Sequence, residues 1–127
     1  MDISFPKSER LCKAKDFEHV FSNGKSLYVF PLKVQFSFIQ TDTPTIKVAF
    51  FISAKKIKKA VHRNYLKRVL REIYRKNKYI LHNEMGNESL FLVFVYLSDE
   101  KLSYHQIEPS VLILLKQLHE VYKKHSG

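Results

Sequence analysis

The alternation of apolar and polar residues along the chain predicts a small sheet. Residues 26–39 are expected to be extended with a bend at Pro31, after which every second position is apolar, as in a strand with one buried face. Residues 46–52 are β-branched and aromatic and predict another strand, expected to pair antiparallel with the first across the turn at 41–44. The continuous apolar run at 90–97 predicts a central strand buried on both faces, and the helix before it favours a parallel partner among the earlier strands.

Three segments repeat apolar side chains at helical spacing instead. The first is a short helix that Asp16 is expected to cap, and the second is a long helix over residues 60–78. The third is expected to begin at Glu108 or later, because Pro109 is best tolerated in a first turn. Residues 81–89, just before the last predicted strand, are expected to form a loop.

The order of these elements predicts the fold class. Helix, three strands, helix, strand and helix follow one another (αβββαβα), which indicates an α+β fold with a small mixed sheet of about four strands packed with three helices. A chain of 127 residues is expected to form one domain around a single core, with loose tails at residues 1–8 and 124–127. The single Cys12 excludes a disulfide framework, and the absence of a signal sequence or a long apolar run favours the cytoplasm.

Composition changes this picture because the net charge of +10 lies in one segment. Residues 55–78 contain eleven basic residues and a single acid, Glu72, so that the rest of the chain is neutral. On a helical projection the apolar residues of 60–78 fall on one side and the basic residues on the other. A ridge about 24 Å long is formed by residues that repeat at every fourth position, namely Lys59, Arg63, Lys67, Arg71 and Arg75.

A neutral domain with one strongly positive element favours a polyanionic ligand, either nucleic acid or an anionic membrane surface. The membrane is the weaker alternative, because the apolar face of this helix is needed to cover the sheet. Asn64 within the basic face is a poor helix former, so a hydrogen bond to RNA or to a neighbouring loop explains its presence better than helix propensity does.

Residue patterns typical of protein-based catalysis are missing from the sequence. The six histidines show no ligand spacing, and the acids are scattered singly apart from Asp99-Glu100. No glycine-rich phosphate loop or nucleophile motif occurs either. We therefore expect no catalytic residue and no metal site built by the chain itself.

Two motifs resemble the protein subunit of bacterial ribonuclease P. Residues 59–72 read K-A-V-H-R-N-Y-L-K-R-V-L-R-E and meet every fixed position of that family's signature, K-A-V-x-R-N-x-x-K-R-x-x-R-E. Residues 10–24, with R-L-x-K followed by D-F-x-x-V-F-x-x-G, are similar to the family's opening helix and turn. The resemblance covers residues 9–122. It departs from many members at Lys58, which replaces a glycine after the lysine pair.

The resemblance implies a role in tRNA maturation. Members join a large catalytic RNA, which cleaves the 5′ leader from precursor tRNA. The Mg²⁺ needed for cleavage is bound mainly by the RNA. No protein partner is required. The implied fold has a left-handed βαβ crossover through the signature helix. The implied RNA-binding residues are Lys55, Lys56, Lys59, Arg63, Asn64, Lys67, Arg68, Arg71 and Arg75.

A cleft between the first helix and the sheet is implied to bind the single-stranded leader. Its implied residues are Phe17, Phe21 and Phe94. The apolar pattern leaves open which face of strands 32–39 and 90–97 lines this cleft. The alternative is that the protein is an RNA-binding or ribosome-associated module that takes no part in catalysis. This alternative explains the basic ridge, but the match to the two motifs would then be a coincidence.

Overall fold

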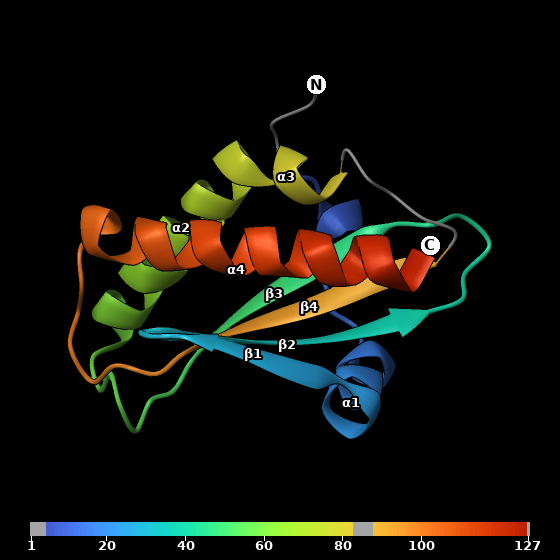
Figure 1. Cartoon of the computed structure of the whole chain (residues 1–127). Coiled ribbons are helices and arrows are strands. Elements are labelled where there is room, and N and C mark those ends of the chain that lie inside the picture. The colour runs from blue at the N-terminus through green and yellow to red at the C-terminus, as the bar shows by residue number, and fades with distance from the viewer. Residues whose placement is uncertain (1–4, 83–87, 127) are drawn as a thin grey trace.

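A computed structural model describes residues 5–82 and 88–126 and has one sheet with helices on both faces (Figure 1). In chain order the elements are a 3₁₀ turn (Lys7–Glu9), α1 (Ala14–Asn23), β1 (Lys25–Val29), β2 (Leu32–Ile39), β3 (Ile46–Ile52), α2 (Ala60–Asn77), α3 (Tyr79–His82), β4 (Ser89–Tyr96) and α4 (Tyr104–Ser126). The predicted α+β class and the four-stranded mixed sheet are confirmed.

The strands are arranged in the order β1-β2-β4-β3. As predicted, β4 is central and has a parallel partner, which is β3; on its other side it pairs antiparallel with β2. The predicted antiparallel pairing of residues 46–52 with the preceding strand is wrong, because β4 lies between β2 and β3. This order places the most apolar strand where both of its edges and both of its faces are covered. The β3–α2–β4 unit is the predicted crossover, and its handedness stays a prediction.

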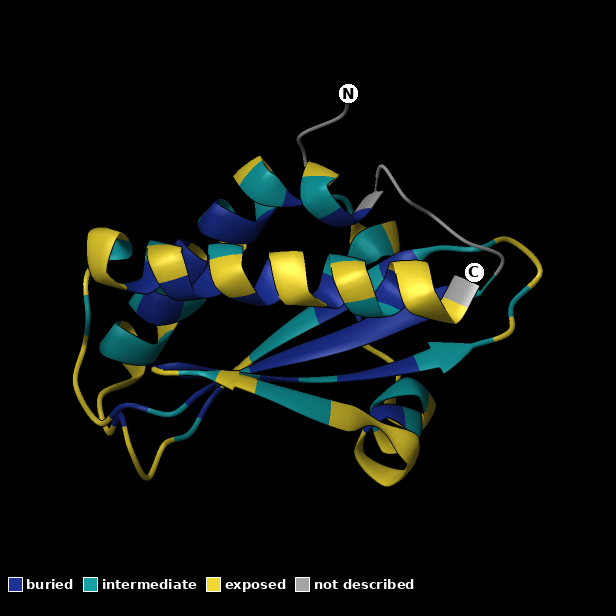
Figure 2. Ribbon diagram, viewed as in Figure 1, coloured by how far each residue is buried: buried dark blue, intermediate teal, exposed yellow. Residues whose placement is uncertain are grey.

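The two faces of the sheet have different coverings. Because successive side chains in a strand point to opposite faces, Leu92 and Phe94 of β4 join the core under α2 and α4. Phe91 and Val93 of the same strand instead pack with Val20 of α1. Every residue of β4 except the half-buried Val95 is therefore buried, whereas α4 is buried only on the side that faces the sheet (Figure 2).

Two helices begin earlier than predicted. Lys13, and not Asp16, occupies the N-cap position of α1. The start of α4 at Tyr104 contradicts the expected start at Glu108 or later, and Pro109 lies inside the helix. Ser103 and Gln106 explain this start: the Ser103 N–H donates to Oε1 of Gln106 at 2.9 Å, and the Gln106 N–H donates to Oγ of Ser103 at 3.3 Å. This reciprocal cap satisfies the first turn and outweighs the proline.

The predicted loop over 81–89 is only partly correct. Its first residues belong to the short helix α3, which sequence analysis missed, and its last residue begins β4. Residues 83–87 lie outside the described part of the chain.

The predicted loose tails are wrong for residues 5–8 and 124–126. Phe5 is buried, and its ring meets that of Tyr74 edge-on at a centroid distance of 5.7 Å. Just after it, Oε1 of Glu9 accepts a hydrogen bond of 2.8 Å from Nζ of the buried Lys78. At the other end, α4 continues to Ser126. The N-terminal segment is therefore held by side-chain packing that a local sequence pattern does not reveal, and residues 124–126 belong to the last helix.

Candidate nucleic-acid interface

The long basic helix is amphipathic, as predicted. α2 buries Leu66, Leu70 and Ile73 completely against the sheet and α4. Its opposite side carries Asn64 and Arg71, both exposed. The fold uses only the apolar side of α2, so the basic side remains available to a ligand.

Acidic side chains compensate only the C-terminal end of this basic side. Arg75 donates to both carboxylate oxygens of Glu72, at 2.6 Å and 3.0 Å, and Lys76 lies 3.8 Å from the same group. These hydrogen bonds from Arg75 lower the pKa of Glu72, which therefore stays ionised at neutral pH. Within the described ranges, no carboxylate forms an ion pair with the remaining ridge residues and their neighbour Arg68, namely Lys59, Arg63, Lys67, Arg68 and Arg71.

Glu72→Gln is expected to strengthen RNA binding severalfold, because it removes the one negative charge of the segment and releases Arg75 and Lys76 from the carboxylate. Stability should change little, since exposed ion pairs contribute little to folding. Filter binding and urea unfolding of the variant measure the two effects. Weaker binding with unchanged stability would show that Glu72 itself contributes to RNA recognition.

Arg63 has a structural role that sequence analysis missed. Its Nη1 atom donates to the main-chain carbonyls of Ile57 and Lys58, each at 2.8 Å. Ile57 is buried, and its N–H donates to the carbonyl of Ser53 at 2.9 Å. Arg63 therefore fixes the loop that precedes α2, and its predicted contact with RNA stays a prediction. Next to it, the exposed side chain of Asn64 has no hydrogen-bond partner within the described residues.

The loop between β3 and α2 holds two of the predicted RNA-binding lysines. Lys55 and Lys56 are both exposed. Nζ of Lys56 donates to the carbonyl of Leu97 at 2.9 Å, which ties this loop to the residue that follows β4. The Lys55 N–H donates to Oγ of Ser53 at 3.1 Å. The loop lysines therefore lie at the edge of the sheet where β3 and β4 end.

An open groove of about 470 Å³ lies on the α1 face of the sheet. The rings of Phe17 and Phe21 are stacked on one side of it, with centroids 6.4 Å apart. Phe21 is 53% exposed, and Phe51 from β3 is 54% exposed. The residues that line the groove are Phe17, Phe21, Lys33, Gln35, Ala49, Phe50, Phe51, Val93 and Val95.

Phe94 does not belong to this groove, so its predicted place in the cleft is wrong. Its ring is fully buried on the other face of the sheet and stacks on Phe50 at a centroid distance of 5.7 Å. The adjacent positions Val93 and Val95 line the groove instead. Lys33 and Gln35 of β2 also line the groove, on a strand whose faces sequence analysis left unassigned. The alternation of residues 32–39 could have identified them, because their polar side chains point away from the main core.

The chain is similar in sequence to known proteins. The ribonuclease P family model matches residues 5–119. This chain belongs to the ribonuclease P protein family. It is 30% identical to the ribonuclease P protein component of Porphyromonas gingivalis over 105 residues, covering 80% of this chain and 77% of that protein. It is 32% identical to the same component of Thermotoga maritima over 120 residues, covering 93% and 98%.

Solved structures of ribonuclease P proteins have the same fold. The protein from Thermotoga maritima superposes with a TM-score of 0.68 at 28% identity, covering 86% of this chain and 96% of that one. The protein from Staphylococcus aureus gives a TM-score of 0.71 at 22% identity, covering 88% and 96%. The chain is thus the protein subunit of ribonuclease P, an endoribonuclease.

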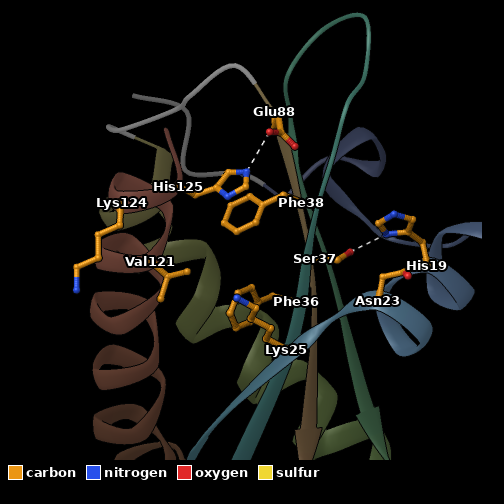
Figure 3. A pocket seen from close by; sticks show the side chains of 10 residues that line it. All are labelled: His19, Asn23, Lys25, Phe36, Ser37, Phe38, Glu88, Val121, Lys124 and His125. Carbon is orange, nitrogen blue, oxygen red and sulfur yellow. Dashed lines mark hydrogen bonds and ion pairs between the residues drawn. The ribbon is translucent and has the colours of Figure 1, made fainter. Parts of the chain in front are cut away.

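This ribonuclease P protein has a second hollow, of about 570 Å³, between α1, the end of β2 and the end of α4 (Figure 3). The ring of His125 stacks on Phe38 at 3.7 Å, and its Nε2 lies 3.0 Å from Oε1 of Glu88. Across the sheet, Nδ1 of His19 lies 2.9 Å from Oγ of Ser37. None of the residues predicted to bind RNA lines this hollow.

Two further properties concern other classes of site. Among residues 5–82 and 88–126, no helix combines the length and apolar character needed to cross a membrane. In the same part of the chain, no three His, Cys, Asp or Glu side chains gather closely enough to hold a metal ion.

Proposed function

We propose that this ribonuclease P protein binds the catalytic RNA of its enzyme through the basic side of α2. The observation that carries the proposal is that the ridge before Arg75 has no acidic partner in the described part of the chain. Lys59, Lys67 and Arg71 have no acidic partner among the described residues, although the apolar side of the same helix is buried. Self-repulsion along a helix is unfavourable in the free protein. Phosphate groups of RNA relieve it, and the planar guanidinium of Arg71 suits bidentate contact with them.

The groove on the α1 face supports a second contact, with the single-stranded 5′ leader of precursor tRNA. Stacking on aromatic rings tolerates any base sequence, as a site for varied leaders requires. Phe21 and Phe51 offer exposed rings, and Lys33 adds a positive charge within the same groove. Leaders of different sequence can therefore bind with similar strength.

The loop that carries Lys55 and Lys56 connects these two surfaces. Phe51 and Val95 line the groove near the ends of β3 and β4, and Leu97 just beyond β4 accepts the hydrogen bond from Lys56. An RNA that lies on α2 and the loop is therefore next to a leader held in the groove. In this arrangement the protein positions the leader, and the RNA, with the Mg²⁺ that it binds, performs the cleavage.

Phe21→Ala in the reconstituted enzyme tests leader binding. Affinity for precursor tRNA should fall by roughly 5- to 100-fold, the range expected for the loss of one base stack, while affinity for mature tRNA stays unchanged. Tyr79→Ala is the matched control, because this aromatic residue is also exposed but lies on α3. For each variant, binding is measured with precursor tRNA, which carries the leader, and with mature tRNA, which lacks it.

Two results would contradict the proposal. Equal loss of affinity for precursor and mature tRNA would indicate general damage to the protein in place of a leader contact. Cleavage of precursor tRNA by the purified protein and Mg²⁺ without RNA subunit would contradict the division of labour between protein and RNA.

A further inference from the structure

A cluster of two cations and one aromatic ring lies beside the ridge of α2. Nζ of Lys101 is 4.5 Å from the centroid of the Tyr65 ring, and Cζ of Arg68 is 5.9 Å from the same centroid. Tyr65 and Arg68 belong to α2, whereas Lys101 comes from the connector between β4 and α4. The folded chain therefore adds a lysine from a distant segment to the basic side of this helix.

The connector holds Lys101 in place through both of its neighbours. The hydroxyl of the buried Tyr96 donates to the carbonyl of Glu100 and accepts the N–H of Leu102 at 3.2 Å. Burial raises the pKa of Tyr96, so the hydroxyl keeps its proton for the first of these bonds. The Glu100 N–H also donates to Oγ of Ser98, at 3.0 Å. The main chain on either side of Lys101 is thus fixed before any ligand binds.

The two cations remain uncompensated although acids are close in sequence. Lys101 and Arg68 are exposed, and neither forms an ion pair with a described residue. Asp99 and Glu100 are exposed as well and make no ion pair with them. The face of an aromatic ring attracts a cation, and the resulting contact restricts the motion of the cationic side chain. A ligand that binds there therefore loses less side-chain entropy than one that binds a free lysine.

We propose that Lys101 and Arg68, held at the Tyr65 ring, bind phosphate groups of RNA and extend the RNA-binding surface of α2 onto the connector. The inference rests on the proposed function of α2, because Arg68 lies within one helical turn of Asn64 and of Arg71. The ligand is the phosphodiester backbone, since two exposed cations from different segments match repeated phosphate charges, and most protein contacts with nucleic acid go to phosphate and sugar. Lys101 is the new member of the interface.

The test measures binding of the RNA subunit by Lys101→Ala over a series of salt concentrations. Removal of one phosphate-binding charge should lower affinity roughly five- to tenfold at about 0.1 M salt and reduce the slope of log K against log salt by about 0.9. Lys101→Arg should restore both quantities because it keeps the charge. Lys116→Ala, which removes another exposed lysine, on α4, should leave the slope unchanged.

Arg71→Ala, measured in parallel, separates this inference from the proposed function. Unchanged binding by Lys101→Ala together with weaker binding by Arg71→Ala would overturn the inference and leave the function of α2 intact. Unchanged binding by both variants would overturn both. Equal losses of RNA affinity in Lys101→Ala and Lys116→Ala would show that only the net charge of the protein matters, and this result would also overturn the inference.

Discussion

RNA binding is expected to fall by roughly 10²- to 10³-fold at about 0.1 M salt when Lys67, Arg68 and Arg71 are replaced together by alanine. The three side chains lie on the basic side of α2, and none has an acidic partner among the described residues. Their removal should also lower the slope of log K against log salt by about 2.7, or 0.9 for each phosphate that is no longer neutralised. Filter binding with the RNA subunit at several salt concentrations measures both quantities.

A matched triple variant on α4 provides the control. Lys116, Lys123 and Lys124 are exposed and carry the same total charge on another helix. Their replacement by alanine should change the affinity far less, because only general attraction to RNA is reduced. Equal losses in the two triple variants would contradict a specific role for α2. Circular dichroism verifies that both variants remain folded, as expected for residues outside the core.

Phe94→Ala is expected to lower the free energy of unfolding by about 3–5 kcal/mol, because it leaves a cavity in a well-packed core. The Phe94 ring is fully buried between β4 and α2, where it contacts the rings of Phe50 and Tyr74. Urea unfolding of the variant measures the loss. The leader should bind normally to the fraction that remains folded, since the ring lies on the face of the sheet away from the groove.

Phe21→Ala is the comparison for Phe94→Ala. Phe21 is exposed on α1 beside the groove, so its removal should affect leader binding and leave the free energy of unfolding nearly unchanged. The opposite pattern, with Phe94→Ala stable but defective in leader binding, would contradict the assignment of the two phenylalanines to different faces.

Local patterns were sufficient for the elements that have one strong periodicity. The helix at 60–78 was correct to within one residue, because its apolar and basic residues separate cleanly around the helical axis. The central position of strand 90–97 also followed from the sequence, because only a strand covered on both faces has a continuous apolar run. Each of these features depends on residues that are neighbours along the chain.

Predictions about which strand pairs with which, or about which face of the sheet a side chain lies on, were less successful. The β-branched and aromatic composition of 46–52 predicts that this segment is a strand but cannot show that β4 lies between it and β2. An unbroken apolar run has no polar residues to mark its two faces, so it could not correct the place in the cleft that the resemblance implied for Phe94. Similarly, the start of α4 was placed too late because Pro109 was read as a first-turn residue, whereas the reciprocal cap by Ser103 and Gln106 was seen only in the structure.

The sequence alone determined that this protein is α+β, that its charge lies on one face of a long helix, and that two motifs resemble the ribonuclease P protein subunit. Tertiary structure alone decided the order of the strands, the second role of Arg63 and the position of Lys101 against Tyr65. Periodicity and charge are properties of contiguous residues, which a sequence displays directly. Contacts between distant segments depend on how the whole chain buries its apolar surface, and no local pattern encodes that.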